Sequence, residues 1–222
     1  VQGYEIEFLT DNTFNIYSVD SLVNPPSGCY DVANQAGWGT WSVSSRQFIE
    51  NKTIPENGLV FVEDHVWIKG QIDGSRVTVA SGRFPDNLST RTSITINEDL
   101  KYTSYDGTDT IALIAQNNIN VGMVSEDDLR VDAALIAQNG RVGRYYYRPP
   151  YWFYNRCSPY HDRDKLSLYG MIGTSQRYGF AYTNGNGYDI REITYDANLL
   201  YGPPPSFPLT SDQYQTISWK EL

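Results

Sequence analysis

The sequence predicts an all-β protein built around a β-solenoid, a right-handed parallel β-helix-like stack of about five coils. The strongest observation is a repeat: Ala112–Asn117 reads Ala-Leu-Ile-Ala-Gln-Asn and recurs as Ala134–Asn139, an offset of 134 − 112 = 22 residues. The second is a series of short runs rich in β-branched and aromatic residues, each closed by Gly, Asp, Asn or Ser. No amphipathic helical pattern separates these runs, which argues against βαβ units.

The first part of the chain, residues 1–57, is expected to be a hairpin and loop region packed on the stack. Tyr4–Leu9 and Phe14–Val19 alternate apolar and polar residues across a turn, which is typical of a β-hairpin. Residues 20–57 contain several Gly and Pro residues and read as loop, with a short strand around Trp41–Val43. The pattern also allows a short helix near Ser45–Asn51.

Residues 58–180 are expected to form the stack. Beside the two hexapeptides, weaker copies occur at Leu59–Asp64, Val77–Gly82 and Leu168–Gly173. Coils of this kind stack because one turn cannot bury its apolar face alone, and identical residues then lie about 4.7–4.9 Å apart. Asn117 and Asn139 are predicted to stack at a corner. The alternative is an antiparallel sandwich in which the repeat is accidental.

The last part, residues 181–222, is expected to be a capping tail that forms one structural unit with the rest. Ile111–Ala115 is apolar at every position, which predicts that this sheet is covered on its outer side by the N-terminal hairpin or the C-terminal tail. Gly202–Pro208 reads as an extended Pro-rich segment, and Asp212–Trp219 as a final strand.

Composition and charge exclude several classes of function. The 222 residues carry 17 Lys and Arg against 26 Asp and Glu, a net charge of −9, whereas a protein that coats nucleic acid is basic. The only Cys and His residues are Cys29, Cys157, His65 and His161, too few and too scattered for a zinc cage. Nucleophile and phosphate-loop motifs are absent from the sequence. We therefore expect no enzyme, no metal and no cofactor.

The two cysteines lie far apart in the sequence and do not form a C-x-x-C motif. In an oxidising compartment, Cys29 and Cys157 would form one long-range disulfide. Two unrelated buried thiols are the alternative.

The ordered set of segments resembles the C-terminal region of PilX-like pilus-assembly proteins, which begin with a type IV pilin-like helix and carry a β-solenoid head. The resemblance covers roughly residues 58–222 and rests on Gly58–Glu63, Val66–Gly70, Arg76–Ala80, Ile111–Asn118, Asp132–Gly140, Tyr195–Tyr201 and Pro203–Pro208. It implies a non-enzymatic, extracytoplasmic head at the cell surface, structural or adhesive, acting in type IV pilus assembly or at the pilus tip. Other pilin or pilus-assembly subunits would be its partners.

The chain begins at Val1 rather than Met. We expect it to be the soluble part of a longer protein, anchored by an N-terminal helix outside this chain and making no membrane contact itself.

An aromatic-basic insertion at residues 141–165 lies outside the shared pattern. It carries 6 − 2 = +4 charges, leaving −13 for the rest of the chain, and eight aromatic residues. Its aromatics could fold down as a second small core held by Cys157, bind a glycan or another protein, or form a platform for DNA. The candidate ligand-binding residues are Arg144, Tyr145, Tyr147, Arg148, Tyr151, Trp152, Tyr154 and Arg156.

Other polar residues have ordinary interpretations beside functional ones. Glu126–Asp128 with Asp132, or the Asn184–Asp189 loop, could hold Ca²⁺ or form solvated corners. His65 reads as a strand residue, and the His161–Asp162 pair has no activated nucleophile beside it. A polysaccharide-degrading β-helix enzyme is a further alternative, but the sequence shows no paired carboxylates for it.

Overall fold

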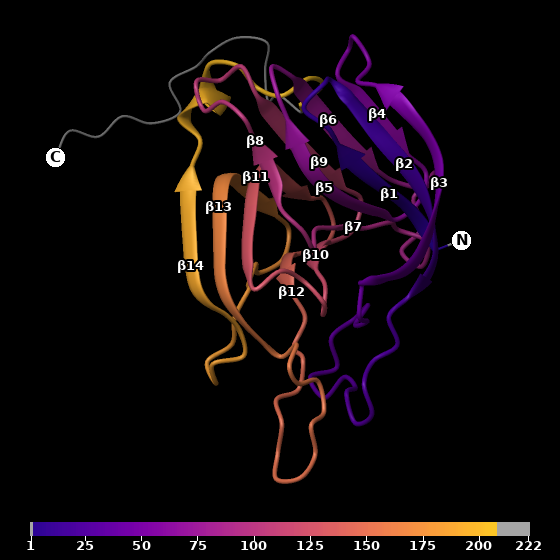
Figure 1. The fold of residues 1–222 in the computed structure, drawn as a ribbon, viewed down its shortest axis with the longest axis vertical. Coiled ribbons are helices and arrows are strands. Elements are labelled where there is room, and N and C mark those ends of the chain that lie inside the picture. The colour runs from indigo at the N-terminus through magenta and orange to yellow at the C-terminus, as the bar shows by residue number, and fades with distance from the viewer. Residues whose placement is uncertain (1, 208–222) are drawn as a thin grey trace, which may run out of the picture.

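The structure is a computed structural model that describes residues 2–207. It is all-β, as predicted: fourteen strands belong to one sheet, which curls into a half-barrel, and the one helix in the described residues is the 3-10 helix η1, Ala197–Leu200 (Figure 1). Most neighbouring strands in the sheet are parallel.

Five parallel strands form a first stack that carries the repeat. They are β4 (Leu59–Val62), β6 (Arg76–Ser81), β9 (Thr110–Ala115), the end of β11 (Asp128–Ala137) and the end of β13 (Asp162–Thr174). These strands coincide with the five segments that the sequence assigned to the stack.

The two hexapeptides lie one above the other in this stack. Ile136 is the register partner of Ile114, and Ala137 that of Ala115. The 22-residue offset therefore returns the chain to the same place on the neighbouring strand.

Two further rows of parallel pairs complete the sheet. One contains β1 (Gly3–Phe8), β5 (Val66–Ile72), β7 (Ile94–Thr95), β10 (Ile119–Val121) and β12 (Val142–Arg144). The other contains the end of β5, β8 (Leu100–Tyr102), the starts of β11 and β13, and β14 (Gly187–Tyr195). The parallel rows thus continue past residue 180 in β14, inside the region expected to be only a cap.

The main core lies inside the curl of the sheet. Side chains from the three rows meet there and are almost completely buried, among them Leu113, Leu135, Ile94, Ile119 and Val131. β-Branched and Leu residues suit this environment because they fill the space between pleated strands closely.

An antiparallel extension covers one end of the sheet. The expected hairpin is confirmed, since β1 pairs with β2 (Thr13–Leu22), and β2 then pairs with β3 (Val43–Thr53). The prediction of a loop or short helix over Ser45–Asn51 was wrong, because this segment is the middle of β3. Most β3 side chains are exposed, so backbone pairing with β2 forms this strand and no buried face marks it in the sequence.

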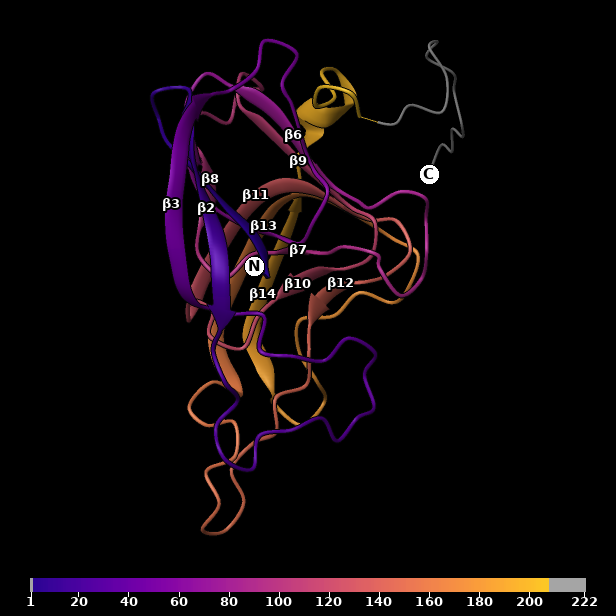
Figure 2. The same ribbon diagram turned by 90° about the vertical axis from the view of Figure 1, so that its right-hand side faces the viewer.

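The C-terminal tail covers the outer side of the first stack, which confirms that this apolar sheet is covered. Leu199 of η1 packs there on Ala112, Ala134, Met171 and Phe207. In Figure 2 the short helix η1, in yellow, lies beside β6 and β9. Arg76 donates to the carbonyls of Gly202 (2.6 Å) and Pro203 (2.9 Å). The predicted strand at Asp212–Trp219 lies outside the described residues.

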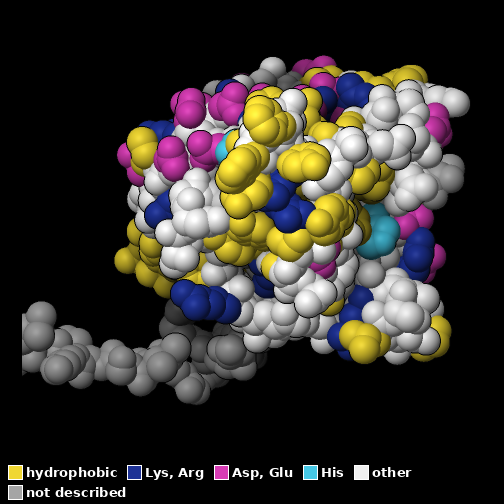
Figure 3. Space-filling model, turned by 90° about the horizontal axis from the view of Figure 1, so that it is seen from below, with side chains coloured by type: hydrophobic (Ala, Val, Ile, Leu, Met, Phe, Trp, Pro, Cys, Tyr) yellow, Lys and Arg dark blue, Asp and Glu magenta, His cyan; other side chains and the backbone are white. Residues whose placement is uncertain are grey.

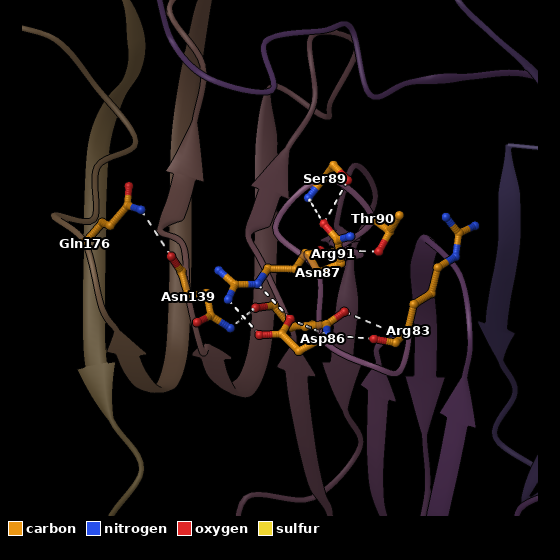
Figure 4. Close-up of polar contacts among 9 residues, drawn as sticks. Arg83, Asp86, Asn87, Ser89, Thr90, Arg91, Asn139 and Gln176 are labelled. Carbon is orange, nitrogen blue, oxygen red and sulfur yellow. Dashed lines mark hydrogen bonds and ion pairs between the residues drawn. The ribbon is translucent and has the colours of Figure 1, made fainter.

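A row of amide side chains connects the turns at one corner of the first stack. Gln176 Nε2 donates to the Asn139 carbonyl (3.1 Å), and Asn139 Nδ2 to the Gln116 carbonyl (2.8 Å) (Figure 4). Gln116 Nε2 continues the row to Asp86 Oδ1 (2.9 Å). An amide row is therefore present at this corner, but it differs from the predicted one, because Asn139 bonds Gln116 and the Asn117 side chain makes no hydrogen bond within residues 2–207.

Candidate binding surface

The base of the aromatic-basic insertion is a second small core. Tyr145, Tyr147 and Cys157 are completely buried there together with Met123 and Cys29. The Tyr147 hydroxyl donates to the Gly39 carbonyl (2.9 Å), so the insertion packs on the segment that precedes β3.

Arg144 is also completely buried, and its guanidinium donates hydrogen bonds mainly to backbone carbonyls. It donates to the Met123 carbonyl (3.0 Å), to Ser125 Oγ (2.9 Å) and to the carbonyls of Gly122 and Tyr160. Burial lowers the pKa of Arg144. Within the described residues no carboxylate pairs with it, so these acceptors compensate for its desolvation.

Three residues of the predicted ligand-binding set are therefore corrected. Arg144, Tyr145 and Tyr147 have no exposed surface and cannot contact an external ligand in this conformation. The reason is that the segment before β3 packs over them: the two tyrosine rings and the hydrogen bonds of all three side chains stabilise the packing of the insertion instead of binding a ligand.

The predicted disulfide is present. Cys29 and Cys157, 128 residues apart, are bonded and join the segment before β3 to the insertion. A structural disulfide is compatible with an extracellular location. In the described part of the chain, no helix has the length and apolarity to span a membrane.

The end of the insertion projects from the molecule (Figures 1 and 2). We call Tyr151–Tyr154 the aromatic tip. Its four side chains are exposed by 56% (Tyr151), 80% (Trp152), 94% (Phe153) and 70% (Tyr154). Tyr151 and Tyr154 exchange two backbone hydrogen bonds of 3.0 Å, which close the turn tightly.

Two arginines of the predicted set flank the aromatic tip. Arg156 lies over the Tyr151 ring at 4.8 Å, and Arg148 over the exposed Tyr30 ring at 4.7 Å. Seen from this end, hydrophobic side chains gather around Lys and Arg groups (Figure 3). Phe153, the most exposed of all, was not in the predicted set, although the same aromatic run could have indicated it.

The possible Ca²⁺ positions are occupied by other contacts. Asp132 is buried and accepts from the Tyr105 hydroxyl (2.6 Å) and the Tyr102 amide (3.1 Å). Asn184 Nδ2 donates to the Tyr146 hydroxyl (2.9 Å), and Asn186 Nδ2 donates to the Tyr147 carbonyl. Within residues 2–207 no group of three or more His, Cys, Asp or Glu side chains is arranged to hold a metal.

The two histidines differ in their contacts, since His161 Nδ1 is buried without a hydrogen-bond partner in the described residues. His65 Nδ1 accepts from the Ser93 amide (3.0 Å), and burial lowers the pKa of His65. Burial likewise lowers the pKa of His161, whose neighbour Asp162 opposes the shift.

The structure brings together two carboxylates that the sequence did not reveal as a pair. Glu126 Oε2 accepts from the Asp99 amide (3.0 Å), and burial followed by the contact with Asp99 raises the pKa of Glu126 to about 7. Burial acts to raise the pKa of Asp99, but hydrogen bonds from the Arg130 amide and from Lys101 outweigh it, so the pKa of Asp99 is lowered. Asp99 and Glu126 are 27 residues apart in the chain, and they meet because successive turns of the sheet stack on one another.

Comparison of the sequence with models of known families found no match, and neither curated proteins nor solved structures gave one.

Proposed function

We propose that this chain is a short β-solenoid head of a pilin-like protein, displayed outside the cell, with a non-enzymatic role in type IV pilus assembly or adhesion. The aromatic tip is its contact surface. The observation that carries this proposal is the exposure of four consecutive aromatic side chains on a projecting loop with a rigid base.

The strand pairings support the solenoid interpretation. The chain passes through the three parallel rows in a recurring order, and the row that carries the repeat has five strands. A stack of this kind is a rigid platform, and its insertions leave at corners where binding surfaces arise.

The aromatic tip has the chemistry of a protein contact. Trp and Tyr supply large, stiff contact area, and such residues dominate binding energies at interfaces. A run of four exposed aromatics costs solubility, whereas single exposed apolar residues are ordinary. The disulfide and the buried Tyr145 and Tyr147 hold the base of the loop, so little ordering entropy is lost on binding.

DNA recognition through the insertion is less well supported. Burial removes Arg144 from the surface, and Arg148 and Arg156 each stack on a tyrosine ring. The chain as a whole is acidic, at −9, which repels a polyanion.

The test uses cells that produce the full-length protein with Trp152→Ser and Phe153→Ser together. These side chains are 80% and 94% exposed, so the free energy of unfolding should change by only about 0.5 kcal/mol. Loss of two interface anchors should lower surface pili or adherence about tenfold or more.

The matched control is Leu200→Ser with Tyr201→Ser, which removes exposed apolar area at the end of η1. In Figure 1 this yellow segment lies at the end of the molecule opposite the projecting insertion. The control should leave pili and adherence unchanged. Normal pili and normal adherence in the tip variant, at equal protein level, would show that the aromatic tip is not the contact.

A further inference from the structure

A cleft of about 630 Å³ with a mixed polar and apolar lining lies between the corner turns of the first stack and the segment that precedes β3. The turns after β6, β9, β11 and β13 each contribute polar side chains to it. Its lining includes Trp41, Arg91, Asn117, Asn139, Arg141 and Gln176. Because these turns follow stacked strands, like groups recur about every 4.7–4.9 Å along the wall. Such a row suits an elongated ligand with a repeating unit.

The amides of this corner keep hydrogen-bonding capacity for a ligand. Asn139 and Gln176 use their NH₂ groups in the row between turns, which leaves both carboxamide oxygens without a partner in the described residues (Figure 4). The Asn117 side chain lines the cleft and makes no hydrogen bond within residues 2–207. Amide groups that both donate and accept match the hydroxyls of a sugar.

The charge of the cleft is opposite to that of the protein. Its charged lining residues are Arg91 and Arg141, and neither Asp nor Glu is among the described residues that line it. Asp86 neutralises Arg91 through two contacts of 2.8 and 2.7 Å. Arg141 stacks over Tyr145 at 4.7 Å and donates to the Arg144 carbonyl (3.2 Å), and in the described chain no carboxylate pairs with it. A single unneutralised guanidinium favours a ligand carboxylate.

Trp41 gives the cleft a fixed aromatic face. Its backbone has φ 49°, a conformation that side-chain-bearing residues adopt rarely. The Trp41 carbonyl accepts from Trp67 Nε1 (3.0 Å) and Asn97 Nδ2 (2.7 Å), and its own Nε1 donates to the Gly37 carbonyl (2.9 Å). The first two contacts fix the Trp41 backbone and the third fixes the indole, and a fixed aromatic ring can pack against the apolar face of a pyranose.

We propose that this corner cleft binds an acidic oligosaccharide, with a uronate carboxylate on Arg141, hydroxyls on Asn117 and Asn139, and a sugar ring against Trp41. This site is separate from the aromatic tip and does not depend on it. A single-stranded nucleic acid fits less well, because it carries one phosphate per nucleotide, whereas Arg141 is the one cation among the described lining residues that no described carboxylate neutralises.

The experiment is calorimetric titration of the whole chain with a galacturonate hexasaccharide and, in parallel, a neutral glucose hexasaccharide of the same length. Only the acidic sugar should bind. Arg141→Gln should weaken its binding about tenfold or more, as expected for loss of a charge-assisted pair. Asn117→Ala removes a side chain without partners in the described structure and should weaken binding about threefold while leaving the thermal midpoint unchanged.

Two controls separate the site from general charge and from the tip. Arg177→Gln removes a neighbouring arginine that is not part of the cleft lining and should leave the affinity within about twofold. Trp152→Ser with Phe153→Ser should bind the sugar normally.

Several results would overturn the proposal. One is the absence of any heat of binding with the acidic sugar at millimolar concentration, and a second is equal affinity for the acidic and the neutral sugar. A third is tighter binding of an oligothymidylate than of the acidic sugar. The fourth is an affinity for the acidic sugar that neither Arg141→Gln nor Asn117→Ala changes. Loss of adherence in the tip variant with no sugar binding would leave the proposed function standing and refute this site alone.

Discussion

At the scale of single residues, the Asp99–Glu126 pair shows how stacking creates chemistry that neither segment has alone. Arg130 and Lys101 stabilise the charged form of Asp99, while Glu126 faces that negative charge and is partly removed from water. The pKa values of the two carboxyls therefore move in opposite directions. Glu126 keeps its proton in a pH range where an isolated Glu has lost it.

Glu126 should make the protein less stable as the pH rises. Its pKa is about 7 in the folded chain and 4.5 ordinarily, so between these values the unfolded chain binds fewer protons than the folded one. Stability therefore falls as the pH rises from about 4.5 to about 7 and is constant above that. Neighbouring groups partly desolvate the Glu126 carboxyl, but the residue as a whole is exposed, so solvent screening keeps the loss small.

The measurement is the free energy of unfolding of Glu126→Gln and of the unchanged protein from pH 4 to pH 8. The variant should gain stability relative to the unchanged protein as the pH rises, because Gln cannot ionise and can still accept from the Asp99 amide. A difference between the two proteins that is independent of pH would contradict the raised pKa.

At the scale of strands, close backbone contact between rows depends on glycine at defined positions. Gly70 of β5 is the register partner of Phe8 in β1 and has φ 103°. A Cβ at Gly70 would meet the backbone nitrogen and carbonyl of Phe8. It lies where β5 passes from its pairing with β1 to its pairing with β8, so the bend needs a residue without a side chain.

Gly70→Ala should lower the free energy of unfolding by about 2–4 kcal/mol, because it combines an unfavourable φ with a backbone clash. Gly179→Ala is the matched control, since a Cβ there meets no atom within 4 Å and its φ lies outside the left-handed region. Its effect should be about 0.5 kcal/mol or less. Urea denaturation of both variants decides the matter, and equal stability of the two would contradict the role given to Gly70.

A strand could be predicted from the sequence where it buries a repeating set of side chains, and not where only backbone pairing with a neighbouring strand forms it. β9 and β11 were found from the sequence because their buried residues repeat, and the repeat itself fixed the register of Ile114 over Ile136. β3 was missed because its exposed side chains carry no apolar alternation, so only the partner strand determines its conformation. The sequence named Glu126 only as a possible Ca²⁺ ligand, and its pairing with Asp99 was missed for a related reason, since their approach follows from the stacking of turns.

At the scale of the whole molecule, two cores meet along the segment before β3. One fills the curl of the sheet, and the other contains the base of the insertion and the disulfide. The sequence could indicate the insertion and the two cysteines, but not which aromatics would be buried. Tyr145, Tyr147 and Phe153 belong to one aromatic run in the sequence. The first two are buried because the segment before β3 packs over them, whereas Phe153 lies beyond that segment and is exposed.

The disulfide between Cys29 and Cys157 joins the second core to the segment before β3. Replacement of Cys29 and Cys157 by Ser opens a loop closed across 128 residues and should lower the free energy of unfolding by about 5 kcal/mol, chiefly through the entropy of the unfolded chain. Most of the apolar burial lies in the curl of the sheet, so that core should remain folded while the second core loosens.

Urea denaturation measures the total loss, and hydrogen exchange locates it. Amide protection should fall in residues 23–42 and 145–158 and persist in β9, β11 and β13, where the backbone bonds belong to the stack. The corner cleft should then lose affinity for the acidic sugar, because Trp41 lies on the loosened segment. Equal loss of protection in the stack would show instead that the two cores unfold as one unit.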